Sequence, residues 1–219
     1  MTFIEFANFL SQIPPVILTL GLVAGVFVFK SLDSLHRSLF WYMALMLGTD
    51  LAGRVLKFTH GNNLIVLPVY SLIELGFFVY FYNRFLLVKP NKILIGLGIV
   101  GAVYIIAEIL GYFVLNTLDI KQFQPYAKVL DNFLIIIMAL AFVQEKMANF
   151  KESGWGNFKL NTVILVFFTL TIIIFLPFNF LINGSSDVKF YFWIVNVIAV
   201  VLFYLFLISE IWKNGRTQK

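Results

Sequence analysis

The stretch ILIGLGIVGAVYIIAEILGYFVL, residues 93–115, decides the fold class of this chain. It contains one charged residue, Glu108, and is longer than the about 20 residues that a helix needs to cross the hydrocarbon core of a bilayer. An uninterrupted apolar run of this length predicts a transmembrane helix, because a buried helix of a soluble domain rarely stays apolar for so long.

Similar runs occur on both sides of this stretch, separated by breakers such as Gly61-Asn62-Asn63 and Lys89-Pro90-Asn91. The sequence therefore predicts seven transmembrane helices. The predicted spans are Pro14–Phe29, Leu39–Phe58, Leu64–Tyr82, Ile93–Leu115, Tyr126–Val143, Leu160–Ile182 and Phe190–Trp212.

Composition supports the same class. The chain has 219 residues, of which 61% are hydrophobic and 12% charged, with a mean hydropathy of +0.93. Soluble domains have about 25% charged residues, so this chain could not cover a globule with polar surface. We expect an all-α, polytopic integral membrane protein with residues 1–219 in a single seven-helix domain. An interfacial segment, Phe3–Leu10, could precede the first span.

Several classes of chemistry are disfavoured by what the sequence lacks. There is no Cys, which excludes disulfides and thiolate sites. His36 and His60 fall in loops on opposite sides, so they cannot hold one metal ion or one haem together. The start of the chain carries Glu5 and no basic residue, unlike a cleavable signal peptide. We expect no cofactor and no metal site.

The distribution of Lys and Arg predicts the orientation, because cytoplasmic loops are enriched in both. Most of the 16 Lys and Arg residues fall on the side that holds the first, third and fifth loops and the C-terminus. The expected cytoplasmic set is Lys30, Arg37, Arg84, Lys89, Lys92, Lys146, Lys151, Lys159, Lys213, Arg216 and Lys219. We therefore expect an outer N-terminus and a cytoplasmic C-terminus in a bacterial inner membrane. The net charge of +5 then indicates topology and attraction to anionic membrane lipids, with no nucleic acid as partner.

Charged and polar side chains inside the spans mark the candidate site. A charge at the centre of a membrane helix costs on the order of 3 kcal/mol, so such groups must face one another or water. At the expected depths these residues all lie in the outer half or the middle of the membrane, which indicates a polar cavity near the outer side. The candidate ligand-binding residues are Asp50, Arg54, Tyr70, Glu74, Glu108, Lys128, Asp131 and Asn196.

The same residues have a purely structural interpretation. Asp50 and Arg54 at i, i+4, and Lys128 and Asp131 at i, i+3, can pair on their own helices and only fix helix positions. Glu74 has no cation on its own helix and is therefore the strongest functional candidate.

Enzymatic chemistry is weakly supported, and we assign no catalytic residues. A retinal protein needs a Lys in the middle of the last span, but Lys189 and Lys213 lie at its edges. Membrane zinc hydrolases and intramembrane serine proteases need His at bilayer depth, and none lies within a predicted span. Two carboxylates that share a proton, such as Glu74 with Asp131, leave only a carboxylate-based membrane hydrolase open.

Three segments carry a family resemblance: VYSLIELGFFVYFYNRFL (69–86), PYAKVLDNFLIIIMAL (125–140) and FWIVNVIAVVLFYLFLISEIWK (192–213). Together they resemble a group of uncharacterised seven-helix membrane proteins of Bacteroidota, some of which stand alone and some of which precede a sensor histidine kinase. In the fifth span the resemblance leads us to expect Arg and Glu where this chain has Lys128 and Asp131. It implies sensing, with a histidine kinase or the subunits of a complex as the protein partner.

The sequence thus favours a non-enzymatic, sensor- or receptor-like signalling module. It would bind a small molecule or lipid group in the outer-half cavity and act through a partner in or under the membrane, since its cytoplasmic loops are short. The alternatives are a small-solute or lipid transporter and a scaffold subunit of a membrane complex. A transporter usually shows an internal repeat, and comparing the first three spans with the last three gives none.

Overall fold

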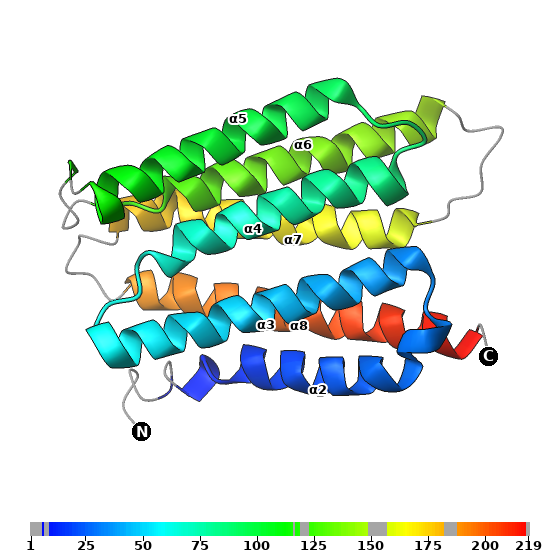
Figure 1. Cartoon of the computed structure of the whole chain (residues 1–219), viewed down its shortest axis with the longest axis horizontal. Helices are drawn as coiled ribbons and strands as arrows, with labels where there is room; N and C mark the ends of the chain where they lie inside the picture. Colours follow the sequence, from blue (N-terminus) through cyan, green and yellow to red (C-terminus); the bar gives the residue numbers. More distant parts are fainter. Residues whose placement is uncertain are drawn as a thin grey trace. The chain divides into compact units, whose positions relative to one another are not determined.

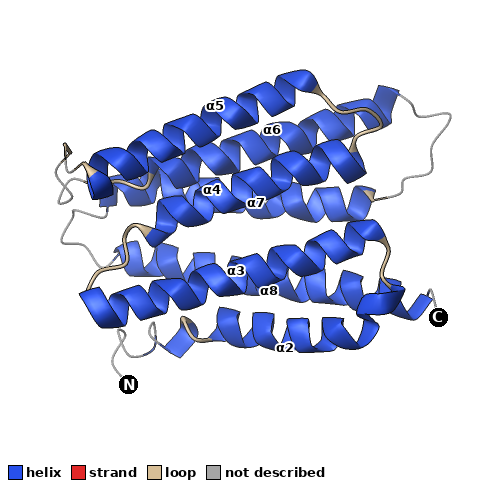
Figure 2. Ribbon diagram, viewed as in Figure 1, coloured by secondary structure: helices blue, strands red, loops and turns tan. Residues whose placement is uncertain are grey.

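The computed structural model describes residues 6, 9–115, 117–118, 123–148, 157–181 and 188–217, with 178–181 and 188–190 described by their backbone alone. Every regular element within these ranges is helical and none is a strand (Figure 2). The elements are α2 (Ile13–Val28), η1 (Phe29–Ser31), α3 (Ser34–His60), α4 (Val66–Phe81), η2 (Tyr82–Leu86), α5 (Lys92–Ile109), η3 (Leu110–Val114), α6 (Tyr126–Ala148), α7 (Phe158–Leu181) and α8 (Val188–Thr217). Most of the proposed interfacial segment Phe3–Leu10 lies outside the described residues.

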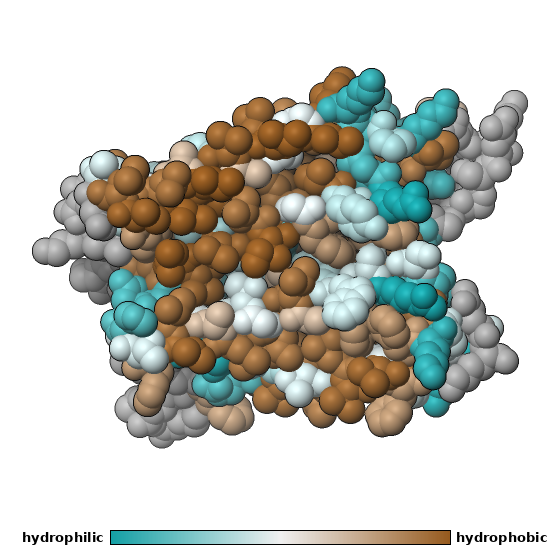
Figure 3. All heavy atoms as spheres, in the orientation of Figure 1, coloured by the Kyte–Doolittle hydropathy of each residue, from teal (hydrophilic) through white to brown (hydrophobic). Residues whose placement is uncertain are grey.

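Seven of the described helices are long and apolar enough to cross a membrane, each at the position of a predicted span. Apolar side chains cover most of the visible surface along the helices, and hydrophilic ones gather near helix ends (Figure 3). The predicted all-helical class is confirmed, and the chain is a multi-pass membrane protein.

Several helices extend beyond the predicted spans. α3 begins at Ser34, five residues before the predicted start at Leu39, because Asp33 caps it: the carboxylate accepts a hydrogen bond from the His36 backbone N–H at 2.8 Å. α8 likewise continues past Trp212 to Thr217. Hydropathy finds only the apolar part of such helices, whereas their polar ends follow from capping.

The chain divides into two compact units, which we describe separately. Unit 1 comprises residues 1–63 and 186–219 and contains α2, α3 and α8 (Figure 1). Its helices pack closely around α2, since a Cβ added at Gly21 would collide with Ile208 of α8 and Met43 of α3. The Gly21-x-x-x-Gly25 spacing of the sequence therefore lies on a packed face.

Unit 2 comprises residues 64–185 and contains α4, α5, α6 and α7 (Figure 1). Within it α6 packs against α4, α5 and α7. Short π-helical segments, η2 and η3, continue α4 and α5 at their C-terminal ends. A π-turn has more residues per turn than an α-helix. The side chains in the last turn of α4 and of α5 therefore point in other directions than a regular α-helix would give them.

Two glycines of α5 give a matched test of this packing. A Cβ at Gly98 would collide with Val79 of α4, whereas one at Gly96 meets nothing within 4 Å. Val79 is β-branched and can hardly rotate away. We expect Gly98→Ala to lower the free energy of unfolding by about 1–3 kcal/mol. Gly96→Ala should be neutral or raise it by up to about 1 kcal/mol, because Ala favours helix. Thermal unfolding in detergent measures both, and equal effects would show that α4 and α5 are not in close contact at Gly98.

Candidate functional site

Three ionisable side chains meet in the interior of unit 2. The Lys128 ammonium of α6 donates hydrogen bonds to the Glu74 carboxylate of α4 and, at 3.1 Å, to the Asp131 carboxylate of its own helix. Glu74 and Asp131 are both 0% exposed and Lys128 is 5% exposed. We call these three residues the buried triad.

Helical periodicity explains how the sequence brings the triad together. Lys128 and Asp131 are three residues apart, so they lie on one face of α6, and the same face continues with buried Ile135. Glu74 lies on the buried face of α4 with Leu75. Because Glu74 has no cation on its own helix, it takes Lys128 from the neighbouring one.

Aromatic rings complete the surroundings of the ammonium group. Lys128 Nζ lies 5.1 Å from the ring centroid of Tyr70 and 5.8 Å from that of Phe168 on α7. Both distances fall within the range of cation–π attraction. Tyr70, which lies one turn before Glu74, therefore borders the buried triad.

The triad has two carboxylates for one ammonium, and hydrogen-bonding capacity around it remains unused. Among the described residues, Asp131 Oδ1 and both polar atoms of the Asn132 amide are buried without a hydrogen-bond partner. The Ser71 hydroxyl lies close enough to the Asp131 carboxylate to form a weak hydrogen bond with it, although the geometry is poor. Buried polar groups are usually satisfied, so these unpaired atoms leave room for hydrogen bonds to a bound molecule or water.

Lys128 also bears on the hydrolase that the sequence left open. Its ammonium contacts both Glu74 and Asp131, so each carboxylate is paired with a cation rather than with the other carboxylate alone. Among the residues that the structure describes, no group of three or more His, Asp and Glu side chains is placed to hold a metal ion.

Glu108 of α5 contacts the residue that precedes Lys128 of the triad. Its Oε2 accepts the backbone N–H of Ala127 at 3.1 Å, in the first turn of α6, beside Lys128. Glu108 is 7% exposed, and its Oε1 has no hydrogen-bond partner among the described residues. The carboxylate thus caps α6 with one oxygen and leaves the other available.

The remaining predicted site residues belong to unit 1. The Asp50 carboxylate accepts Arg54 Nε at 2.6 Å, and both side chains are about one-third exposed. Arg54 also donates to Gln12 Oε1 at 2.6 Å and to the Ser11 carbonyl at 2.7 Å. The pair therefore ties α3 to the chain that precedes α2, which is the structural role described above for same-helix pairs. Asn196 of α8 has a buried Oδ1 without a partner in the described structure.

Sequence reasoning did not single out three buried polar residues of unit 2: Ser71, Asn132 and Asn161. All three are 0% exposed. The Asn161 amide accepts the Tyr82 hydroxyl at 2.8 Å and donates to the Ala139 carbonyl at 3.2 Å, which joins α7 to η2 and α6. The sequence did contain a signal for two of them. Ser71 lies one helical turn from Glu74, and Asn132 lies one turn from Lys128, so both fall on the faces that carry the charged residues.

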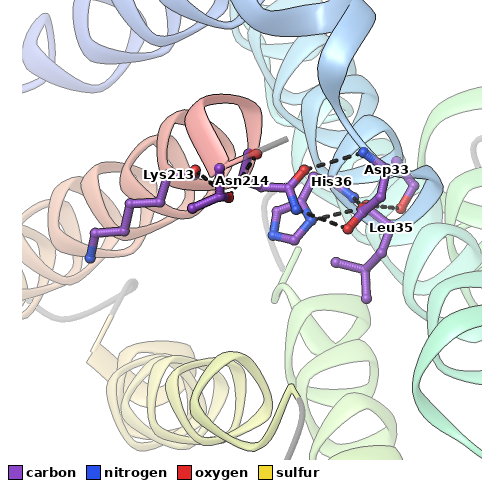
Figure 4. A network of polar contacts seen from close by, with 7 residues as sticks. Asp33, Leu35, His36, Lys213 and Asn214 are labelled. Carbon is purple, nitrogen blue, oxygen red and sulfur yellow. Dashed lines mark hydrogen bonds and ion pairs between the residues drawn. The ribbon is translucent and has the colours of Figure 1, made fainter. Parts of the chain in front are cut away.

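A second polar network, in unit 1, joins the end of α8 to the start of α3 (Figure 4). The Asn214 side chain donates to Asp33 Oδ2 at 3.0 Å and accepts the Asp33 backbone N–H at 3.2 Å. His36 Nδ1 lies 2.8 Å from Asp33 Oδ1. Burial raises the pKa of Asp33, but the hydrogen bonds and charge of His36 and the Asn214 amide together hold that pKa below its ordinary value of 3.8.

The lowered pKa predicts a pH effect. The stability that Asp33 contributes should be complete above its unfolded pKa and vanish as the pH falls through its lower folded pKa. The difference in free energy of unfolding between wild type and Asp33→Asn should therefore be larger at about pH 5 than below about pH 4. Unfolding in detergent at a series of pH values measures it, and a difference that grows towards acid pH would contradict the assignment.

No protein-family model, no curated protein and no solved structure matches this chain. The site must therefore be interpreted from its own chemistry.

Proposed function

We propose that the chain is a non-enzymatic, sensor- or receptor-like module that binds a small molecule or lipid group at the buried triad of unit 2. The observation that carries this proposal is the placement of two carboxylates and one ammonium, all buried, in helices that can cross a membrane. Ionisable groups at such depth are costly and mark functional sites by default.

Charge balance indicates the kind of ligand. Two carboxylates share one ammonium at the triad, and Asp131 Oδ1 can accept a further hydrogen bond. A ligand that is cationic or rich in hydrogen-bond donors would satisfy both features. A triad that served stability alone would have little advantage over apolar residues, which often stabilise a core as well.

Orientation and partner complete the proposal. The distribution of Lys and Arg supports an outer N-terminus and a cytoplasmic C-terminus in a bacterial inner membrane. The module would act through a protein partner, and the resemblance of its sequence favours a histidine kinase.

A transporter of small solutes or lipids is the second candidate. Intramembrane carboxylates beside a Lys also form proton relays in transporters, and the triad has that composition. Reconstituted vesicles that accumulate a solute when a proton gradient is applied would favour this candidate over a sensor.

Replacing Glu74 with glutamine tests the proposal. Gln keeps the shape of Glu74 and an acceptor for Lys128 but removes the charge. We expect Glu74→Gln to abolish function wherever deletion of the gene has a measurable effect, while the melting temperature stays close to that of wild type. Glu145→Gln is the matched control, because Glu145 of α6 lies outside the triad and accepts the Val88 N–H at 2.8 Å. If Glu74→Gln behaves as wild type, the triad is structural and the scaffold interpretation becomes the better one.

A further inference from the structure

Glu108 lies among three tyrosines at the end of unit 2 where α5 finishes and α6 begins. Tyr104 and Tyr112 are four residues before and after it, and both lie within electrostatic range of its carboxylate. Tyr126, the first residue of α6, lies within electrostatic range of both tyrosines. Helical spacing places Tyr104 on the same face of α5 as Glu108, and Tyr126 directly precedes Ala127, whose backbone N–H binds Glu108. We call Glu108 and the three tyrosines the tyrosine–Glu108 cluster.

Two of the tyrosine rings of the cluster are exposed, whereas its carboxylate is buried. Tyr104 and Tyr126 are each 45% exposed, whereas Glu108 is 7% exposed. The unpartnered Glu108 Oε1 is buried, and no described side chain donates to it, including the tyrosine hydroxyls. Exposed aromatic rings near a buried acceptor would suit an organic cation.

The start of α6 stabilises negative charge on the Glu108 carboxylate and so offsets part of the cost of its burial. The Ala127 N–H, in the first turn of α6, donates to Glu108 Oε2, and the positive end of the α6 dipole stabilises negative charge there. Lys128 is the nearest basic residue along α6, but its ammonium is directed to the carboxylates of the buried triad. Among the described residues, no basic side chain forms an ion pair with Glu108.

We infer that the tyrosine–Glu108 cluster binds a primary ammonium group, either of a free amine or of an ethanolamine lipid headgroup. Glu108 Oε1 would accept a charge-assisted hydrogen bond from the ammonium N–H, and the rings would add cation–π attraction. An aromatic belt at the membrane surface also places tyrosines near headgroups, but it does not require a buried carboxylate with an unused oxygen. The inference rests on the proposed function only in treating unit 2 as a ligand-binding unit.

Two cations of different hydrogen-bonding capacity test the inference. Ethanolamine can donate from its ammonium group, whereas tetramethylammonium has the same charge and no N–H. The melting temperature of the detergent-purified full chain is measured against each cation at constant ionic strength. We expect a saturable rise with ethanolamine and a rise at least about tenfold weaker in apparent affinity with tetramethylammonium. In parallel, native mass spectrometry of protein extracted from mixed phosphatidylethanolamine and phosphatidylglycerol vesicles shows which lipid is retained.

Matched variants locate the binding. Glu108→Gln keeps an acceptor for the Ala127 N–H, so α6 stays capped while the charge is lost. It should abolish the response to ethanolamine and the retention of phosphatidylethanolamine, whereas Glu145→Gln should keep both. Tyr104→Leu should weaken both, in contrast to Tyr80→Leu, which removes a 55% exposed tyrosine of α4.

Each outcome decides the inference. A response to ethanolamine alone assigns a free amine, and retention of phosphatidylethanolamine alone assigns the lipid. The inference is overturned if neither occurs, or if Glu108→Gln or Tyr104→Leu respond as their control variants do. It is tested by binding alone, so it can fail while Glu74 remains essential in cells, or hold while Glu74→Gln behaves as wild type.

Discussion

Lys128→Met is expected to lower the free energy of unfolding by about 3–5 kcal/mol, the largest loss that we predict for one residue. The change removes the ammonium group that lies between Glu74 and Asp131, both 0% exposed. Two carboxylates then remain buried and adjacent without a cation. Unfolding in detergent should show a large decrease in melting temperature.

Lys146→Met is the control for this variant. Lys146 lies in the last turn of α6 and contacts the ring of Phe142 at 5.5 Å, but it makes no ion pair with a described residue. Its replacement should change stability by less than about 1 kcal/mol. Similar effects for Lys128→Met and Lys146→Met would mean that the carboxylates of the triad gain little from the ammonium group.

Replacing the whole triad should have the opposite effect on stability. In the variant Glu74→Met, Lys128→Met, Asp131→Leu, no charge is left unpaired and side chains of similar volume fill the same space. Replacing a buried ion triad by apolar residues is often neutral or stabilising by about 1–4 kcal/mol. We therefore expect this triple variant to melt at or above the wild-type temperature, well above Lys128→Met alone. A triple variant no more stable than the single one would show that the site needs its polar groups in order to fold.

The number of spans could be predicted from the sequence because apolar runs are a local signal. The ends of the helices could not, since α3 starts where Asp33 caps it and α8 ends beyond its apolar part. The division into two units could not be predicted from the sequence either. Unit 1 joins α2 and α3 to α8 from the other end of the chain, and such non-local contacts leave no periodic signal.

The candidate site shows the same limit. Spacing along one helix predicts the pairs Asp50–Arg54 and Lys128–Asp131, which the structure contains. The contact between Glu74 and Lys128 depends on how α4 and α6 pack, so the sequence could only mark Glu74 as lacking a partner on its own helix. The buried Asn132 amide was not recognised, because one amide in an apolar helix carries no spacing rule.

Function of the triple variant tests the central claim most directly, since it separates folding from recognition. The variant is expressed from its own locus, its level in the membrane is matched to wild type, and the phenotype of the gene deletion is measured. If the buried triad of Glu74, Lys128 and Asp131 is the binding site, the stable variant should be as inactive as the deletion. Wild-type function in a triple variant that is folded and present at the normal level would contradict the account.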